Sequence, residues 1–149
     1  MTTRSGRPGG FLSAAETKQV EDAIAAAERE TSGEIRVLVS RTVRGDPLHA
    51  ARERFTQLKM HQTRERNGVL ILLAVASRRF AIWGDEGVHR IVGQEGWDHL
   101  RDGMVQRFQQ DDFGGGLAYA VGEVAKVLKT HFPWQPDDRD ELPNQVVEE

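Results

Sequence analysis

The sequence of 149 residues contains no cysteine. A disulfide scaffold, a cysteine-ligated zinc site and a cysteine nucleophile are therefore excluded. The chain also lacks a long hydrophobic run, because its longest apolar stretch covers only residues 69–76, whereas a membrane helix needs about 20 apolar residues. A secretory signal has an apolar stretch after its basic N-terminal residues, and no such stretch follows the arginines near this N-terminus. We therefore expect a soluble, cytoplasmic protein without a membrane span.

An excess of positive charge is missing as well. The formal net charge is −3, and residues 11–136 carry 17 basic and 17 acidic side chains. Domains that bind nucleic acid usually show a basic excess, so we expect no nucleic-acid partner. Both ends are rich in Gly, Pro or acidic residues. This pattern predicts a flexible segment over residues 1–10, a single domain over 11–134 and a flexible acidic tail over 135–149.

The sequence also lacks the motifs of the common hydrolase nucleophiles. It holds no G-x-S-x-G, D-x-D-x-T or R-H-G segment, which excludes the standard covalent hydrolase and phosphatase sites. The glycine run 114–116 is not followed by the Lys-Ser or Lys-Thr pair of a phosphate-binding loop.

What the sequence does contain is an alternation of helix and strand patterns. The helix patterns cover residues 13–32, 46–61, 97–108 and 117–128, and the strand patterns cover 34–43, 69–75 and 80–83. The second strand is apolar throughout, which is typical of a strand covered on both faces. The order predicts a small α/β/α sandwich. Its mixed sheet has two parallel strands plus an antiparallel return strand, flanked by about four to five helices.

Acidic residues gather at one predicted edge of this sheet. Because the return strand runs antiparallel, Asp85 and Glu86 at its end should lie beside Asn67, where the second strand starts. Asp98 and Asp102, one turn apart on the next helix, can add two carboxylates from one face. Convergent carboxylates without His or Cys partners favour Ca²⁺ or Mg²⁺ over zinc. We therefore predict that these five residues form a divalent-cation site; the alternative is that they are helix caps and solvated side chains.

Arginines gather at the opposite predicted edge. Arg44 follows the first strand, and Arg78 and Arg79 lie in the hairpin after the second. Open α/β sheets usually bind ligands at the carboxyl ends of their parallel strands, which is this edge. We predict that Arg44, Arg78 and Arg79 bind phosphate; the alternative is that they are ordinary charged turn residues.

Four segments then follow one another along the chain in an order typical of a known family. They are E-T-S-G-E-I-R-V at 30–37, R-N-G-V-L-I-L at 66–72, F-A-I-W-G-D-E-G at 80–87 and D-D-F-G at 111–114. Together they resemble the motifs of the TPM domain family, named for a thylakoid lumen protein, a photosystem II repair protein and an acetylcholine-receptor modulator. The resemblance implies an α/β/α sandwich, Ca²⁺ binding and the acid phosphatase activity described for plant members. Arg66 stands where the common pattern of the family has aspartate.

Three interpretations of function stay open at this point. The first is a domain that binds Ca²⁺ or Mg²⁺, with metal-assisted hydrolysis of a phosphomonoester as an added activity. The second is a non-catalytic protein-interaction domain, which would need an exposed groove or apolar patch around Trp83, Trp97 or Trp134. The third is a phosphatase that relies on Arg78 and Arg79.

Overall fold

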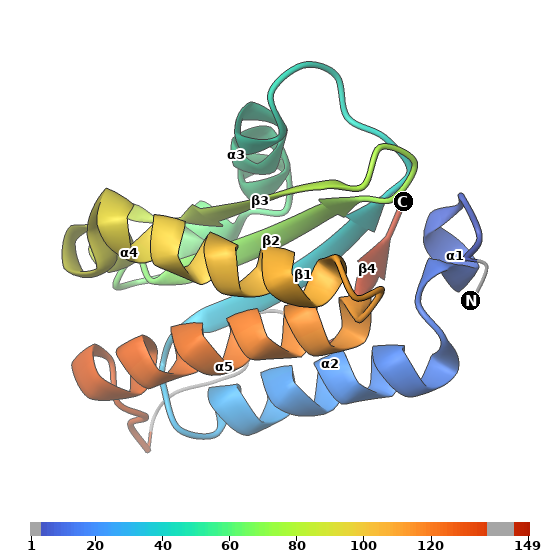
Figure 1. Cartoon of the computed structure of the whole chain (residues 1–149). Helices are drawn as coiled ribbons and strands as arrows, with labels where there is room; N and C mark the ends of the chain where they lie inside the picture. The colour runs from blue at the N-terminus through green and yellow to red at the C-terminus, as the bar shows by residue number, and fades with distance from the viewer. Residues whose placement is uncertain (1–3, 137–144) are drawn as a thin grey trace.

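The computed structural model describes residues 4–136 and 145–149. Within them, helices and strands alternate largely as the sequence predicts (Figure 1). The helices are α1 (Pro8–Phe11), α2 (Ala14–Glu28), α3 (Pro47–Gln57), the short 3-10 helix η1 (Met60–Gln62), α4 (Glu86–Phe108) and α5 (Phe113–His131). The strands are β1 (Glu34–Ser40), β2 (Gly68–Ala74), β3 (Arg79–Gly84) and β4 (Val147–Glu148).

The strands in the described part of the chain form one mixed sheet in the order β3-β2-β1-β4. β1 and β2 are parallel, in a register that pairs Glu34 with Gly68. β3 runs antiparallel to β2 and pairs Gly84 with Val69. The predicted α/β fold, with two parallel strands and a return strand, is therefore confirmed. The sequence did not predict β4, which runs parallel to β1 on the side away from β2.

Local sequence signals explain where two of the helices begin. Ser13 and Glu16 form a capping box at the start of α2, in which each side chain accepts a hydrogen bond from the backbone N–H of the other. Asp46 caps α3 through its side chain, and Pro47 occupies the first helical position. Both helices were predicted from these residues, and the expected hydrogen bonds are present.

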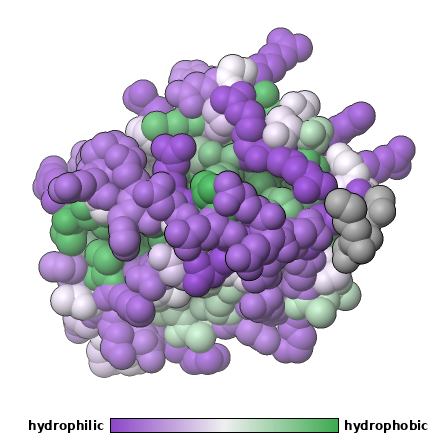
Figure 2. All heavy atoms as spheres, in the orientation of Figure 1, coloured by the Kyte–Doolittle hydropathy of each residue, from purple (hydrophilic) through white to green (hydrophobic). Residues whose placement is uncertain are grey.

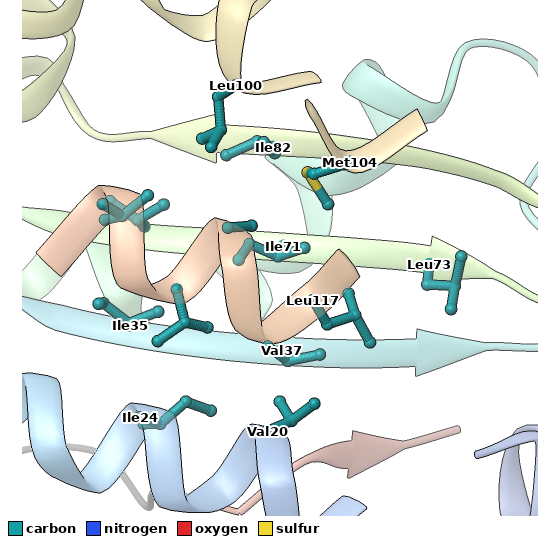
Figure 3. Packing of buried hydrophobic residues seen from close by; sticks show 14 of the residues in the cluster. Val20, Ile24, Ile35, Val37, Ile71, Leu73, Ile82, Leu100, Met104 and Leu117 are labelled. Atoms are coloured by element: carbon teal, nitrogen blue, oxygen red, sulfur yellow. The ribbon is translucent and has the colours of Figure 1, made fainter. Parts of the chain in front are cut away.

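Helices cover both faces of the sheet, so that the domain has three layers (Figure 1). α3 lies on one face, where Phe55 packs with Leu70 and Leu72 of β2. On the other face α5 lies between α2 and α4, and Figure 3 shows Ile24 of α2 and Leu117 of α5 among the strand side chains of this core. All of β2 is buried as a result, as its continuous apolar run predicted.

α4 contains a break that the sequence pattern anticipated. We expected a short helix or turn as far as Val92 and a separate helix from Trp97. The two are joined in one helix, but Gly93 inside it has φ 69° and ψ 169°. Because a positive φ costs glycine little, the helix changes direction at the residue that tolerates the change.

Part of the segment over residues 1–10, for which we predicted flexibility, contacts the rest of the domain through Arg4. Arg4 donates hydrogen bonds to the carboxylates of Glu16 at 2.6 Å and Asp111 at 3.0 Å, and its side chain is only 8% exposed. These charge-assisted bonds tie the segment to α2 and to the start of α5. The composition of the segment did not reveal them, because both partners are distant in sequence.

The last residues of the tail predicted over 135–149 also contact the domain. Val147 pairs with Leu38 of β1, and the N–H of Glu149 donates to the C=O of Val39 at 3.0 Å. The carboxylate of Glu149 accepts a hydrogen bond from Arg54 of α3 at 2.8 Å. The end of the chain is therefore paired with the sheet, whereas residues 137–144 of the predicted tail lie outside the described residues. The domain boundaries at 11 and 134 stay a prediction.

The surface carries few large hydrophobic side chains. Figure 2 shows a face on which hydrophilic residues predominate and hydrophobic ones form small patches. No helix within residues 4–136 or 145–149 is long and apolar enough to cross a membrane. Over the same residues, Leu48, Ile91 and Trp134 are the exposed large hydrophobic side chains.

Candidate functional site

The end of β3 meets the start of β2, as the sequence predicted. The N–H of Asp85 donates to the C=O of Gly68 at 2.9 Å, and the N–H of Gly87 donates to the C=O of Arg66 at 2.9 Å. Asp85 therefore lies beside the loop that contains Asn67. The antiparallel course of β3, on which the predicted acidic edge depended, is confirmed.

Asp85 is the N-cap of α4, and its side chain is 5% exposed. Its Oδ1 accepts hydrogen bonds from the N–H of Glu86 and from Nη2 of Arg66, both at 2.8 Å. Its Oδ2 accepts a hydrogen bond from Nε of Arg66 at 2.7 Å. Two parallel bonds from one guanidinium make a strong bidentate pair, and the hydrogen bond with Asp85 raises the pKa of Arg66.

The carboxylate of Asp85 at this edge already has partners within the protein. The guanidinium of Arg66 already occupies both oxygens of Asp85, so a cation would first have to displace it. Asn67 is 2% exposed, and its side-chain N–H₂ donates to Ser32 at 3.2 Å. The carboxylate of Glu86 lies 3.8 Å from Nη1 of Arg66. Arg66 therefore faces the carboxylates of Asp85 and Glu86, and the amide N–H₂ group of Asn67 is held by Ser32.

Asp98 and Asp102 lie farther along α4. Both occupy exposed positions beyond the break at Gly93, and Asp98 accepts a hydrogen bond from Gln94 at 2.9 Å. Asp98 lies 12 residues after Glu86, beyond the change of direction at Gly93. Over the described ranges 4–136 and 145–149, no group of three or more His, Asp or Glu side chains could hold a metal ion. Binding of Ca²⁺ or Mg²⁺ stays a prediction, and the described structure does not gather the five proposed ligands.

The predicted basic edge is brought together in part. Nη1 of Arg79 donates to the C=O of Gly45 at 3.2 Å, so the hairpin before β3 contacts the loop that contains Arg44. Arg44 itself is exposed. The guanidinium of Arg78 lies 5.5 Å from the ring centre of Phe113 and is thereby directed toward the start of α5. Phosphate binding by these three arginines stays a prediction.

A groove of about 860 Å³ runs along β3, between the start of α3 and the outer face of α4, and we call it the β3 groove. Every residue of β3 lines it. Two tryptophans and four arginines are also among its lining residues. These are Trp83, Trp97, Arg66, Arg78, Arg79 and Arg101. The groove therefore combines aromatic surface with groups that bind anions.

The aromatic walls of the groove are held by specific contacts. Trp97 packs against Gly84 so closely that a Cβ atom at Gly84 would lie 2.4 Å from the indole ring. Nε1 of Trp97 donates to Nδ1 of His89 at 2.9 Å. On the opposite wall, the guanidinium of Arg52 from α3 lies 5.6 Å from the ring centre of Trp83. Contacts to the protein therefore fix both tryptophans.

The acidic side chains of the groove are engaged, whereas two of its arginines have no acidic partner. Asp85 is paired with Arg66, and Asp46 accepts the hydrogen bond that caps α3. Arg79 and Arg101 make no ion pair with a carboxylate anywhere in the described part of the chain. The groove is thus suited to an anionic ligand.

The sequence interpretation identified the groove only in part. Trp83 and Trp97 were proposed as the centre of an interaction surface, and both line the groove. Trp134, proposed with them, does not line it, and its N–H bonds to the C=O of Glu30. In the sequence, Arg101 looks like an ordinary solvent-exposed residue of a helix. Arg52 contacts Trp83 only because α3 packs over β3. No local signal could have indicated these two residues.

Comparisons with known proteins agree with this fold. A family model described as "TPM domain" matches residues 7–127. Among solved structures, the NMR structure of BA42 protein from the psychrophilic bacterium Bizionia argentinensis is 42% identical, covers 92% of this chain and 94% of its own, and has a TM-score of 0.83.

Two more distant structures share the fold alone. The N-terminal domain of a protein from P. gingivalis is 21% identical with a TM-score of 0.67, over 83% of this chain and 80% of that one. The N-terminal domain of cg2496 from Corynebacterium glutamicum is 16% identical with a TM-score of 0.59, over 93% and 81%. No curated protein sequence matches the chain.

Proposed function

This chain belongs to the TPM domain family, and we propose that it binds an anionic ligand in the β3 groove. The observation that carries the proposal is the pair Arg79 and Arg101. Both line the groove, and neither makes an ion pair with a carboxylate of the described residues. A guanidinium in such a position is free to form charge-assisted hydrogen bonds with a carboxylate or a phosphate.

The surroundings of these arginines support the same conclusion. The partly exposed Trp83 offers apolar surface beside the cationic groups, a combination that is frequent where a protein recognises a partner. Trp97 lines the same groove but is only 7% exposed. Arg66 neutralises Asp85, so this buried carboxylate does not repel an anion. A binding role of this kind agrees with the protein-interaction alternative that the sequence left open.

Calorimetric titration with inorganic phosphate and with p-nitrophenyl phosphate tests the proposal. We expect binding that the double variant Arg79→Ala/Arg101→Ala weakens at least tenfold, because each lost charged hydrogen bond is worth about 1 kcal/mol or more. Arg29→Ala is the control, since it removes one exposed arginine at the end of α2, outside the groove; Arg79→Ala and Arg101→Ala are compared with it singly as well. Binding that survives in the double variant, or that neither phosphate shows, would contradict an anion site here.

Hydrolysis of a phosphomonoester is a second candidate, and the name of the matching family model, TPM_phosphatase, favours it. The activity would need Arg78 and Arg79 to hold the phosphate. Turnover of p-nitrophenyl phosphate should then fall when either arginine is replaced by Ala, while Arg29→Ala keeps it. If neither substitution lowers the turnover, Arg78 and Arg79 do not form the phosphatase site.

Binding of Ca²⁺ or Mg²⁺ also stays a prediction, as does a cytoplasmic location. Titration of the protein with each cation tests the first. Arg66 already binds both oxygens of Asp85. If Asp85→Ala still shows the heat of cation binding, the cation binds elsewhere. The exposed residues Asp98 and Asp102 are then the next to be replaced.

A further inference from the structure

The outer edge of β3 carries backbone groups without partners. In an antiparallel pair, the residues that hydrogen-bond to the neighbouring strand alternate with those that face away from it. The N–H of Asp85 donates to Gly68 of β2, so this alternation directs Phe80, Ile82 and Gly84 outward. No other described residue donates to or accepts from the backbone of these three.

The β3 groove leaves this edge accessible over its whole length. Each residue of β3 lines the groove, together with the start of α3 on one side and α4 on the other. Trp83 and Trp97 lie on its two sides. A free strand edge between two walls is the arrangement in which an extended peptide can add as a further strand.

We propose that the β3 groove binds an extended peptide with acidic side chains, which pairs with β3 as an additional strand. The proposal rests on the anionic-ligand site proposed above and names its ligand. The backbone of the peptide would bond to Phe80, Ile82 and Gly84, and its acidic side chains would meet Arg79 and Arg101. A strand rises about 3.3 Å per residue, so about six residues of peptide match the length of β3.

The opposite edge of the same sheet contains an interaction of this kind. There, the acidic segment β4 pairs with β1, and Arg54 of α3 bonds to the carboxylate of Glu149 at 2.8 Å. On the side of β3, the same helix places Arg52 over Trp83. α3 thus presents an arginine toward each edge of the sheet, and only the β1 edge has an acidic strand beside it within the described residues.

Amide hydrogen exchange on the isotope-labelled full chain tests the proposal. The probe is a capped peptide of about six Glu and Val residues, arranged so that Glu side chains lie on both faces of the added strand and can meet both Arg79 and Arg101. We expect it to slow exchange at the amides of Phe80, Ile82 and Gly84. Ala81 and Trp83 should change little, because their amides already face β2.

Two control peptides separate pairing from simple charge attraction. The first carries a methyl group on every backbone nitrogen, so it keeps its charge but loses its N–H donors. The second replaces Glu by Lys. We expect each to bind at least tenfold more weakly than the probe. Equal binding of the methylated peptide, or binding of the probe without slower exchange at the three amides, would overturn strand addition.

The remaining outcomes distinguish this inference from the function on which it rests. Phosphate binding without peptide binding would overturn strand addition and leave the anion site in place. Failure of both ligands would remove both proposals. A dimer of the free protein in which these three amides are already protected would show that a second copy covers the edge, and it would likewise overturn the proposal.

Discussion

The sheet ends on one side at β4 and on the other at β3, and these two edges differ in what covers them. Beside β1, a short acidic strand satisfies backbone groups, and Arg54 holds the carboxylate of Glu149. Beside β3, no described residue pairs with the outward groups, and a groove lined by arginines and tryptophans follows the strand. Proteins usually shield free strand edges. An edge that stays open between two walls is therefore a candidate for binding, whereas the covered edge serves stability.

The largest effect is expected where β3 ends. Gly84→Val would place side-chain atoms where the indole of Trp97 now packs, and such overpacking costs about 3 kcal/mol. Urea denaturation followed by tryptophan fluorescence measures the change. Gly122→Ala is the control, because nothing lies within 4 Å of its Cβ position, and it should raise stability by about 0.5–1 kcal/mol. A neutral Gly84→Val would mean that Trp97 is not held against this edge.

Removal of the covering strand should have the next largest effect. A chain that ends at residue 144 loses the pairing of β4 with β1 and the bond from Arg54 to Glu149. We expect a loss of about 2 kcal/mol, from a few hydrogen bonds and one partly exposed ion pair. Exchange at the β1 amides should become faster, as at a free edge. Unchanged stability and exchange would show that β4 does not cover this edge in solution.

Loss of the cap at the end of the open edge should cost less. Asp85→Ala removes the acceptor for the N–H of Glu86 at the start of α4, which typically costs about 1 kcal/mol. Asp85→Asn keeps an acceptor oxygen for the cap while removing the charge that Arg66 contacts. If both variants lose the same free energy of unfolding in denaturation experiments, the loss comes from the ion pair with Arg66 and not from the cap.

A pH dependence is expected at the hairpin end of β3, where Arg4 joins α2 to the start of α5. Burial acts to raise the pKa of Glu16, but hydrogen bonds from Arg4 and from the N–H groups of Ser13 and Gly114 outweigh it and lower the pKa to about 2. A lowered folded-state pKa adds stability above the unfolded value of 4.5. That stability is lost as the pH falls from about 4.5 to about 2.

Melting temperatures of the parent and of Glu16→Gln between pH 6 and pH 2 measure this contribution. The variant should lose less stability on acidification than the parent. Parallel curves would show that Glu16 does not contribute to the acid sensitivity of the fold.

The sequence predicted those features that depend on neighbouring residues. The run at 69–75 identified β2, and the capping residues Ser13 and Asp46 marked the starts of α2 and α3. The short link after residue 75 predicted the antiparallel turn of β3 and so placed Asp85 beside Asn67. Each of these signals lies within a few positions of the structure that it specifies.

The features that escaped prediction depend on residues far apart in the chain. Arg66 and Asp85 are 19 positions apart, and Arg66 meets the carboxylate from a left-handed conformation with φ 52°, which its sequence context does not indicate. β4 is only a few residues of an acidic segment, too short for a strand pattern. The β3 groove itself exists only after α3 and α4 pack on either side of β3.

The complete burial of β2 has a consequence for the synthesis of the chain. α3 precedes this strand, but α4 and α5, which help to cover its other face, follow it and extend to His131. The seven residues of β2, which are rich in Val, Leu and Ile, therefore leave the ribosome before α4 and α5 can cover them. Such segments tend to self-associate when exposed. We therefore expect this central strand to be prone to self-association until α4 and α5 have been synthesised.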